Sequence, residues 1–216
     1  SDDSPLTLAD QAGHDKIVSF LNETNIPVLS EEGKHLPFNQ RKEWDSFWLV
    51  DPLDGTKEFV KRNGEFTVNI ALIHQGKAIL GVVQVPVQNK LYYSTIDKGA
   101  FLFANGKEEK LQVNTFNMKD KGLKVVASRS HLNEDTQAFM DQLNEPVIVS
   151  MGSSLKLLAV AEGTADLYPR FAPTMEWDTA AAHAVVEGAG GQVLQGNTSL
   201  AVIYNKENLL NPHFLV

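Results

Sequence analysis

The chain has 216 residues, of which 43% are hydrophobic and 21% are charged, and it contains no cysteine. These values are typical of a globular protein with one sizeable core, and they exclude a disulfide framework or a thiolate site. The formal net charge of −8 argues against nonspecific nucleic-acid binding, which needs a basic face. No apolar run approaches the roughly 18–20 residues that span a bilayer. An acidic protein with an anionic substrate would need cations or a local basic pocket.

The first half of the chain predicts one helix followed by a sheet. The helix begins at Thr7 or Asp10 and ends near residues 22–25. Alternating apolar and polar residues, separated by turn residues, predict strands at 27–30, 47–50, 66–73, 78–85, 90–95 and 100–103. Residues 34–46 and 59–65 are expected to be connecting loops.

The second half of the chain alternates strands with helices, which predicts an α/β layer. The expected strands are 123–128, 146–149 and 165–168, and the expected helices are 133–143, 155–162 and 179–189. We therefore divide the single unit 1–216 into an N-terminal α+β half, 1–118, and a C-terminal α/β half, 119–216.

The most informative stretch is 51–56, Asp-Pro-Leu-Asp-Gly-Thr, which directly follows a predicted buried strand. Asp51 and Asp54 would emerge together at the strand end, one in register with the strand and one after a Pro turn. Such acids suit a hard divalent cation, which takes oxygen ligands and often a substrate phosphate. The alternative interpretation of these six residues is a solvated Asp-Gly turn without a ligand.

Further carboxylates lie at predicted element ends: Asp10, Glu31, Glu32 and Asp178. Each has an ordinary explanation alone, since Asp10 could start a helix, Asp178 could be an N-cap, and the Glu pair could be solvated. Together they are harder to explain, because clustered like charges repel unless cations hold them. Two or three magnesium ions about 3.5–4 Å apart are the common use of such a cluster in phosphate hydrolysis.

The spacing of the two Asp residues bears on mechanism. Phosphatases that form an aspartyl-phosphate use two Asp residues two positions apart, whereas Asp51 and Asp54 are three apart. This spacing favours direct attack by a metal-activated water over a covalent intermediate.

Basic and hydroxyl side chains in the second half could bind an anion. The six His residues show no metal-ligand spacing, but His131 closes a Ser-Arg-Ser-His segment directly after a predicted strand. Ser153, Lys156 and Arg170 are further candidates, and Ser153 and Lys156 could share a helix face. Each would more often be a surface residue if it were considered alone.

Several motifs together resemble one family. They are W-x-V-D-P-L-D-G-T-K-E-F at 48–59, S-E-E at 30–32, S-R-S-H at 128–131, G-S-S-L-K at 152–156, L-Y-P-R-F at 167–171 and W-D-T-A-A at 177–181. The chain resembles the inositol monophosphatase superfamily over nearly its whole length, and within it the bacterial 3′(2′),5′-bisphosphate nucleotidases. The resemblance implies a layered α/β/α/β/α sandwich of the inositol monophosphatase and fructose-1,6-bisphosphatase type. It also implies one or two helices before the S-P-x-T-x-A-D segment at 4–10, and we expect these to be missing here.

The resemblance assigns roles to the acidic residues. The metal ligands would be Glu31, Asp51, the backbone carbonyl of Leu53, Asp54 and Asp178, with two or three Mg²⁺ ions bound and Glu32 behind them. Asp10 would accept a hydrogen bond from Thr56, and Thr56 would orient and help deprotonate the attacking water. The backbone N–H groups of Gly55 and Thr56 would hold the phosphate undergoing hydrolysis.

The second half would then select the substrate. By the resemblance, His131, Ser153, Lys156 and Arg170 would line the nucleotide pocket beside Asp178, and the basic members would bind a second phosphate. The implied reaction converts adenosine 3′,5′-bisphosphate to AMP and phosphate, and the implied partner is this small molecule, not a nucleic acid.

The resemblance also implies a cellular context. Family members accept the sulfated analogue, which links them to sulfate assimilation, and they are typically inhibited by lithium. We expect a cytoplasmic monomer or homodimer without a transmembrane segment, with peripheral association at the inner membrane face as a further option. The alternatives are an inositol-monophosphatase-like or sugar-phosphate phosphatase, and a catalytically inactive nucleotide-binding domain.

Overall fold

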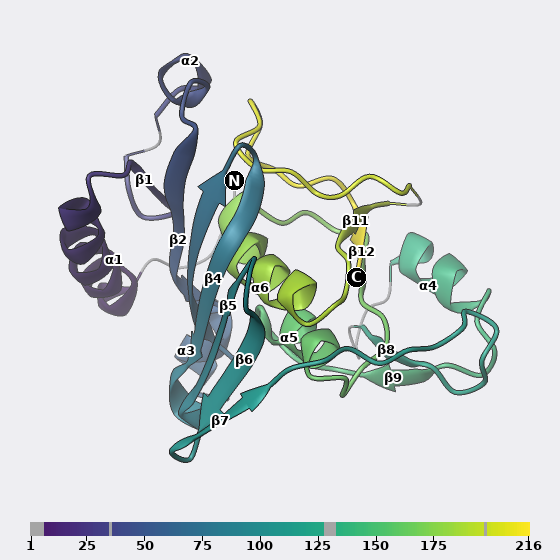
Figure 1. The fold of residues 1–216 in the computed structure, drawn as a ribbon. Coiled ribbons are helices and arrows are strands. Elements are labelled where there is room, and N and C mark those ends of the chain that lie inside the picture. Colours follow the sequence, from purple (N-terminus) through teal and green to yellow (C-terminus); the bar gives the residue numbers. More distant parts are fainter. Residues whose placement is uncertain (1–6, 35, 128–132, 197) are drawn as a thin grey trace.

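Five layers follow one another across the computed structural model, which describes residues 7–34, 36–127, 133–196 and 198–216 (Figure 1). From left to right in Figure 1 they are helix α1, a large sheet, helices α5 and α6, two small sheets, and helix α4. The layers correspond to the predicted α/β/α/β/α sandwich. The elements and their bounds are given in the next paragraphs.

The large sheet has seven strands in chain order, β1-β2-β3-β4-β5-β6-β7. Strands β1 and β2 are parallel, and all later neighbours are antiparallel. The strands are β1 Val28–Ser30, β2 Ser46–Asp54, β3 Thr67–His74, β4 Lys77–Val85, β5 Lys90–Thr95, β6 Gly99–Ala104 and β7 Lys107–Lys110. The meander predicted from alternating residues is confirmed, because β3 alternates buried and more exposed side chains along its length.

Helix α1, Leu8–Leu21, packs on β1 and β2 at one face of the sheet. Thr7 is its N-cap, and the Thr7 hydroxyl accepts hydrogen bonds from the backbone N–H groups of Ala9 and Asp10. Asp10 completes a capping box by accepting a hydrogen bond from the Thr7 backbone N–H, 2.8 Å away. The predicted start of this helix is confirmed, and the capping box fixes the buried carboxylate of Asp10 against the sheet.

Helix α6, Glu176–Gly188, crosses β2 to β6 on the opposite face of the sheet. Its approach is closest at Gly81 in β4, where an added Cβ would lie 2.1 Å from the carbonyl oxygen of Ala181 and 2.9 Å from the Ala184 methyl group. Real Cβ atoms do not come that close, so only glycine fits at this position. Small residues on the strand and the helix therefore set how near α6 lies to the sheet.

The second half forms two smaller sheets and the remaining helices. The sheets contain parallel β8 Lys124–Val126 and β9 Val147–Val149, and antiparallel β10 Pro169–Arg170, β12 Phe214–Leu215 and β11 Leu194–Gln195. Helix α5, Leu155–Ala161, packs against α6, and helix α4, Glu134–Met140, contacts β10. The main core lies between the large sheet and α5 and α6, and a smaller core surrounds Val125.

The structure corrects several expected boundaries. Strand β2 continues through Asp54 with an irregularity between Asp51 and Asp54, so the expected Pro turn is a bulge within the strand. Two short helices were not expected: α2 Phe38–Arg41 lies within the expected loop 34–46, and α3 Thr56–Lys61 extends into the expected loop 59–65. Two single-turn 3₁₀ helices follow α1 and β4, at Asn22–Thr24 and Pro86–Gln88. The strand expected at 165–168 is a single bridge at Leu167, and β10 comes after it.

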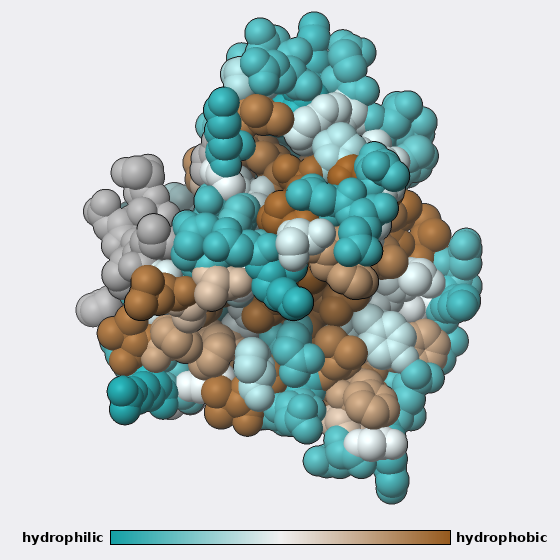
Figure 2. Space-filling model, turned by 90° about the vertical axis from the view of Figure 1, so that its left-hand side faces the viewer, coloured by the Kyte–Doolittle hydropathy of each residue, from teal (hydrophilic) through white to brown (hydrophobic). Residues whose placement is uncertain are grey.

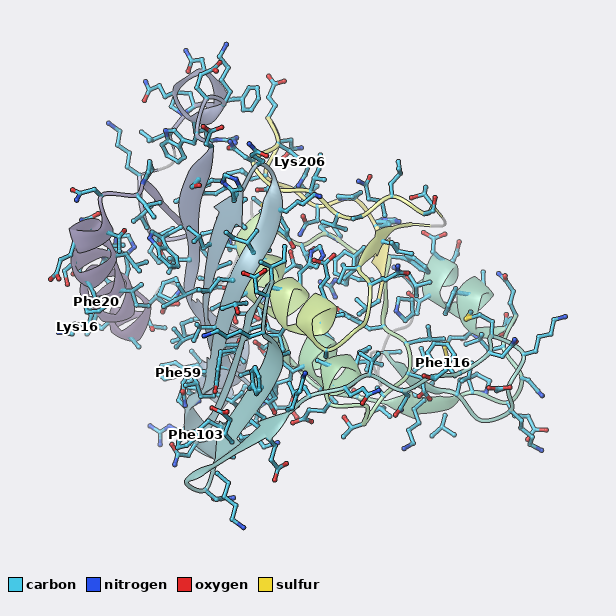
Figure 3. All side chains as sticks on the ribbon, viewed as in Figure 1. Lys16, Phe20, Phe59, Phe103, Phe116 and Lys206 are labelled. Carbon is cyan, nitrogen blue, oxygen red and sulfur yellow. The ribbon has the colours of Figure 1, made fainter. Side chains whose placement is uncertain are left out.

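The α1 side of the molecule faces the viewer in Figure 2, where apolar surface lies among polar surface. Phe20 of α1 is 69% exposed and points outward beside Lys16 in Figure 3. Within the described part of the chain, no helix combines the length and apolar character needed to cross a bilayer.

Candidate functional site

The centre of the candidate site is the irregular end of β2. Asp51 pairs with Asn69 of β3 and Asp54 pairs with Thr67, so the two strands lose their regular register over Pro52 and Leu53. The backbone N–H of Leu53 donates to Asp51 Oδ1 at 3.0 Å. Proline cannot donate to the neighbouring strand, which explains why the bulge occurs here.

Gly55 ends the bulge and leads into α3. Its φ is +95°, and an added Cβ would lie 3.1 Å from the backbone oxygen of Glu65 and 3.3 Å from the Ser153 side chain. Both facts require glycine, because other residues rarely adopt this φ and would also press on the neighbouring loop. The tight turn places Thr56 at the first position of α3, two residues after Asp54.

Asp51 is surrounded by other acids. It is 1% exposed, and burial raises the pKa of its carboxyl well above the usual range. The charges of Asp54, Glu31 and Asp178, and a side-chain hydrogen bond with Glu31, raise that pKa further. The structure therefore brings together four acidic side chains from three separate segments of the sequence: the residue after β1, the end of β2 and the first turn of α6.

A magnesium ion fits this group by donor chemistry, because every candidate ligand is an oxygen atom. Within residues 7–34, 36–127, 133–196 and 198–216, however, no three His, Asp or Glu side chains are arranged so that they could hold a metal ion as they stand. The carboxylate of Asp54 is held by the Ser153–Ser154 turn. Its Oδ2 accepts hydrogen bonds from the Ser153 hydroxyl at 2.5 Å, the Ser154 backbone N–H at 2.6 Å and the Ser154 hydroxyl at 2.7 Å.

The Ser153–Ser154 turn contacts the candidate metal ligands directly, whereas the family resemblance assigns Ser153 to the nucleotide pocket. Ser153 has a φ of +50° and also contacts the Thr67 hydroxyl at 2.8 Å. The Ser154 hydroxyl lies 2.7 Å from the Asp54 carboxylate and 2.9 Å from the backbone oxygen of Asp178, and it accepts a hydrogen bond from the Asn69 amide at 3.0 Å. Ser154 thus bridges the end of β2 and the first turn of α6.

Sequence analysis missed Ser154, Thr67 and Asn69 as parts of the site. Thr67 and Asn69 are buried on the face of β3 that further along carries the apolar Ala71 and Ile73. Polar residues on the core-facing positions of an otherwise apolar strand were the available indication, since buried polar groups need partners. Their partners here are Ser153 and Ser154.

Thr56 contacts Asp10 as the resemblance implied. The Thr56 hydroxyl lies 3.3 Å from Asp10 Oδ1 and 3.4 Å from the backbone oxygen of Leu53. Asp10 is 2% exposed, and its other oxygen accepts hydrogen bonds from the backbone and hydroxyl of Thr7. The α1 capping box therefore holds Asp10 so that one carboxylate oxygen faces Thr56.

Asp178 is the third residue of α6, not its N-cap as one interpretation of the sequence had it. The N-cap is Met175, and Asp178 accepts a hydrogen bond from the Met175 backbone N–H at 2.8 Å. An acid at this position satisfies a free N–H at the helix start and favours the positive end of the helix dipole. The first turn of α6 thereby presents Asp178 to the acids of β1 and β2.

Lys156 in α5 is a basic group close enough to this centre for its charge to interact with those of Asp54 and Asp178. Its ammonium donates to the Ser153 backbone oxygen at 2.7 Å and lies 6.0 Å from the centre of the Tyr168 ring. Burial lowers the pKa of Lys156 to about 8, although the negative charge of Asp54 opposes that shift. Arg170 donates to the Pro173 backbone oxygen at 3.0 Å, and its charge also acts on Lys156.

Two predicted site residues, His131 and Glu32, remain to be placed. His131 lies outside the described residues. Glu32 lies in the turn after β1, next to Glu31. Their predicted roles stay predictions, as do the ligand, catalytic and substrate-binding roles of the other site residues.

Comparison with known proteins gives consistent matches. The model of the inositol monophosphatase family matches residues 1–213. The chain is 48% identical over 217 residues to the 3′(2′),5′-bisphosphate nucleotidase CysQ of Salmonella typhimurium, covering 100% of this chain and 86% of that protein. It is 35% identical to the CysQ of Haemophilus influenzae, covering 100% and 81%.

Solved structures agree with the sequence comparisons. The crystal structure of CysQ from Bacteroides thetaiotaomicron matches with a TM-score of 0.90 and 46% identity, covering 100% of this chain and 85% of that one. An inositol monophosphatase of Staphylococcus aureus shares the fold alone, with a TM-score of 0.79 and 24% identity over 95% of this chain and 77% of that one. These matches confirm the predicted fold class.

Proposed function

Because the chain belongs to the inositol monophosphatase family, we propose that it removes the 3′-phosphate of adenosine 3′,5′-bisphosphate to give AMP and phosphate. The predicted family and enzyme class are confirmed: this is a phosphoric monoester hydrolase of the bisphosphate nucleotidase type. The observation that carries the substrate proposal is the position of Lys156. It donates to the backbone of Ser153, whose hydroxyl is bonded to Asp54. A cation so near the acids suits a substrate with a second phosphate.

Family membership implies a metal-dependent phosphatase, and we assign two or three Mg²⁺ ions to Glu31, Asp51, the Leu53 carbonyl, Asp54 and Asp178. Bound there, magnesium would supply a more acidic water and positive charge for the phosphate oxygens. Glu32 would not bind the metal itself but would help to orient the side chains that do. The pKa of Asp51 is raised by burial and, in addition, by repulsion from the neighbouring acids, and the ions would offset this repulsion.

The chain's own residues then handle the proton and the phosphate. Thr56 Oγ1 would accept the proton of the attacking water while its own proton passes to Asp10 Oδ1, 3.3 Å away. The backbone N–H groups of Gly55 and Thr56 would hold the reacting phosphate, since Gly55 leaves room for a close approach. No covalent intermediate on Asp51 or Asp54 is required.

The remaining contacts would select the nucleotide. We assign Lys156 and Arg170 to the 5′-phosphate, and Ser153, His131 and the neighbourhood of Asp178 to the rest of the substrate. By the same reasoning the sulfated analogue would be accepted, which places the enzyme in sulfate assimilation, and lithium would inhibit it. A cytoplasmic monomer or homodimer stays our working assignment.

Phosphate release in the presence of Mg²⁺ tests this proposal directly. Adenosine 3′,5′-bisphosphate and inositol 1-phosphate are compared at matched concentrations with the same enzyme preparation. We expect a large preference for the nucleotide, because inositol 1-phosphate offers no second phosphate to Lys156 and Arg170. A preference for inositol 1-phosphate would keep the metal chemistry but overturn the substrate assignment. No release from either would support the inactive binding domain.

Replacing Lys156 tests whether this residue binds the 5′-phosphate of the substrate. Lys156→Ala should raise the KM for adenosine 3′,5′-bisphosphate by about 10- to 100-fold, the usual loss for a charged hydrogen bond, and should change the KM for adenosine 3′-monophosphate much less. An equal effect on both substrates would show that Lys156 does not contact the 5′-phosphate.

The same lysine predicts a pH dependence that can be measured in steady-state kinetics. Its pKa is lowered to about 8, so the free enzyme carries the charge below pH 8 and loses it as the pH rises through that value. For the bisphosphate, kcat/KM should therefore fall above pH 8. Lys156→Arg keeps its charge throughout this range and should remove the decline. A decline that persists in Lys156→Arg would assign it to another group.

A further inference from the structure

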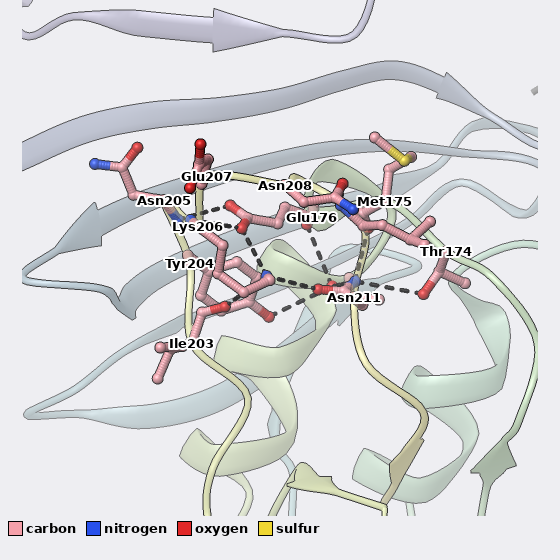
Figure 4. A network of polar contacts seen from close by, with 12 residues as sticks. Thr174, Met175, Glu176, Ile203, Tyr204, Asn205, Lys206, Glu207, Asn208 and Asn211 are labelled. Atoms are coloured by element: carbon pink, nitrogen blue, oxygen red, sulfur yellow. Dashed lines mark hydrogen bonds and ion pairs between the residues drawn. The ribbon is translucent and has the colours of Figure 1, made fainter. Parts of the chain in front are cut away.

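A fully buried glutamate lies at the first position of α6, two residues before Asp178. Glu176 is 0% exposed, and both of its oxygens accept hydrogen bonds from the C-terminal loop 203–211 (Figure 4). Oε2 accepts from the Asn205 backbone N–H at 2.7 Å. Oε1 accepts from the Lys206 backbone N–H at 3.0 Å and from the Lys206 ammonium at 2.6 Å. A glutamate without such donors would not be stable in this position.

The same loop also holds the two residues that precede α6. The Asn211 backbone N–H donates to the Thr174 oxygen at 2.8 Å, and the Asn211 amide donates to the Met175 oxygen at 2.8 Å. The Lys206 ammonium reaches Asn211 Oδ1 at 3.4 Å. A continuous set of bonds therefore runs from Glu176 through Lys206 and Asn211 to Met175.

Met175 links this network to the candidate site. Its carbonyl is held by Asn211, and its N–H donates to the carboxylate of Asp178 at 2.8 Å. Glu176 itself donates its backbone N–H to Leu209 of the same loop at 2.9 Å. The loop thus binds the start of α6 at two places, the Met175 carbonyl and the Glu176 N–H, just before Asp178.

The outer side of the loop is fixed as well. Arg41 of α2 is 2% exposed and donates to Asn205 Oδ1 at 2.7 Å and to the Glu207 backbone oxygen at 2.9 Å. The Asn205 amide donates back to the Arg41 carbonyl at 2.9 Å. The loop is therefore hydrogen-bonded both to α2 and to the start of α6.

We propose that the Glu176–Lys206 ion pair is a positioning device for Asp178: it fixes loop 203–211 against the first turn of α6, and so sets the direction of the Asp178 carboxylate. This inference rests on the proposed function, in which Asp178 is a magnesium ligand. Neither Glu176 nor Lys206 touches the substrate or the metal in this scheme. Buried ion pairs add little net stability compared with apolar residues, so a role in fixing geometry accounts for this pair better than stability does.

The test measures magnesium binding to the metal-free full chain by isothermal titration calorimetry, together with thermal unfolding. The variants are Glu176→Gln, Lys206→Gln, and the double variant. Lys206→Gln leaves both backbone donors to Glu176 in place, so it serves if Glu176→Gln does not fold. Asp178→Asn removes a predicted ligand, and Val186→Ala is a control that weakens the core further along α6.

We expect Glu176→Gln and Lys206→Gln each to weaken magnesium binding by about tenfold, the lower end of the losses seen for groups that support metal ligands. The double variant should lose no more affinity than the worse single variant, because both changes break one pair. Val186→Ala should unfold at a lower temperature and bind magnesium like the wild type.

The outcomes separate the two proposals. If Asp178→Asn binds weakly while both pair variants bind like the wild type, the positioning role is overturned and the metal assignment stands. If Asp178→Asn binds like the wild type, the metal role of Asp178 is wrong, and the inference falls with it. Affinity lost in the pair variants and also in Val186→Ala would show a general effect of instability, which likewise overturns the positioning role.

Discussion

Asp54→Asn should lower kcat for adenosine 3′,5′-bisphosphate by about 10²- to 10³-fold, since removing one ligand charge forfeits a few kcal/mol of transition-state stabilisation. The fold should persist, because asparagine has nearly the same volume. Its amide oxygen can still accept the hydrogen bonds that Ser153 and Ser154 now give to Asp54 Oδ2. Single-turnover phosphate release measures the loss.

Thermal unfolding of Asp54→Asn provides the control, and it should occur close to the wild-type temperature. The interpretation of activity depends on this, because Asp54 also ties the Ser153–Ser154 turn to β2. Activity near that of the wild type in a folded Asp54→Asn variant would remove Asp54 from the metal ligands. Raising the magnesium concentration should restore part of the lost rate if the charge matters through the ion.

Thr56→Val should lower kcat by about 10²- to 10⁴-fold, the usual contribution of a positioned proton acceptor. Valine matches threonine in shape but has no hydroxyl, so the proton path from the water to Asp10 is broken. The KM should change little, because the backbone N–H of residue 56 remains. Steady-state kinetics over a range of substrate concentrations separates the two parameters.

Thr56→Ser is the matched variant, since it restores a hydroxyl 3.3 Å from Asp10 in the wild-type arrangement. It should recover most of the activity that Thr56→Val loses. A Thr56→Val enzyme with full kcat would contradict the proton path and leave only a structural role for the contact between Thr56 and Asp10.

Sequence patterns predicted well those parts of the molecule whose structure is determined by residues close together in the sequence. Strand β3 alternates apolar core positions with more exposed ones, and the start of α1 follows from a capping box that Thr7 and Asp10 form within one turn. The Asp51 and Asp54 cluster was predictable because acids at the end of an apolar strand are unusual. These features depend on residues close together in the sequence.

Other features have causes that no local pattern contains. Strand β12 pairs Leu215 with Pro169 and with Leu194, across long separations and over only two residues in each strand. The N-cap of α6 is Met175, which lacks the short polar side chain that usually marks a helix start, so Asp178 was a natural but wrong choice for one interpretation.

Local sequence patterns also fail to identify some residues of the candidate site. Ser154 belongs to it only because tertiary packing brings α5 beside the end of β2, where its hydroxyl lies 2.7 Å from Asp54. Helix α3 is the exception, since Glu58 in its first turn and Lys61 in its last turn match the helix dipole. That indication was present in the sequence and was outweighed by the glycine and charged residues that follow.

The close contact between α6 and the sheet at Gly81 affects the geometry of the candidate site, although Gly81 lies outside that site. Asp51 and Asp54 belong to the sheet, whereas Asp178 belongs to α6, so the distance between these acids depends on how closely the helix packs on the sheet. That spacing is determined where the helix backbone at Ala181 rests directly on a strand without an intervening side chain. The geometry of the candidate site therefore depends on a residue, Gly81, that takes no part in the proposed chemistry, and a larger residue there would move α6 away from the sheet.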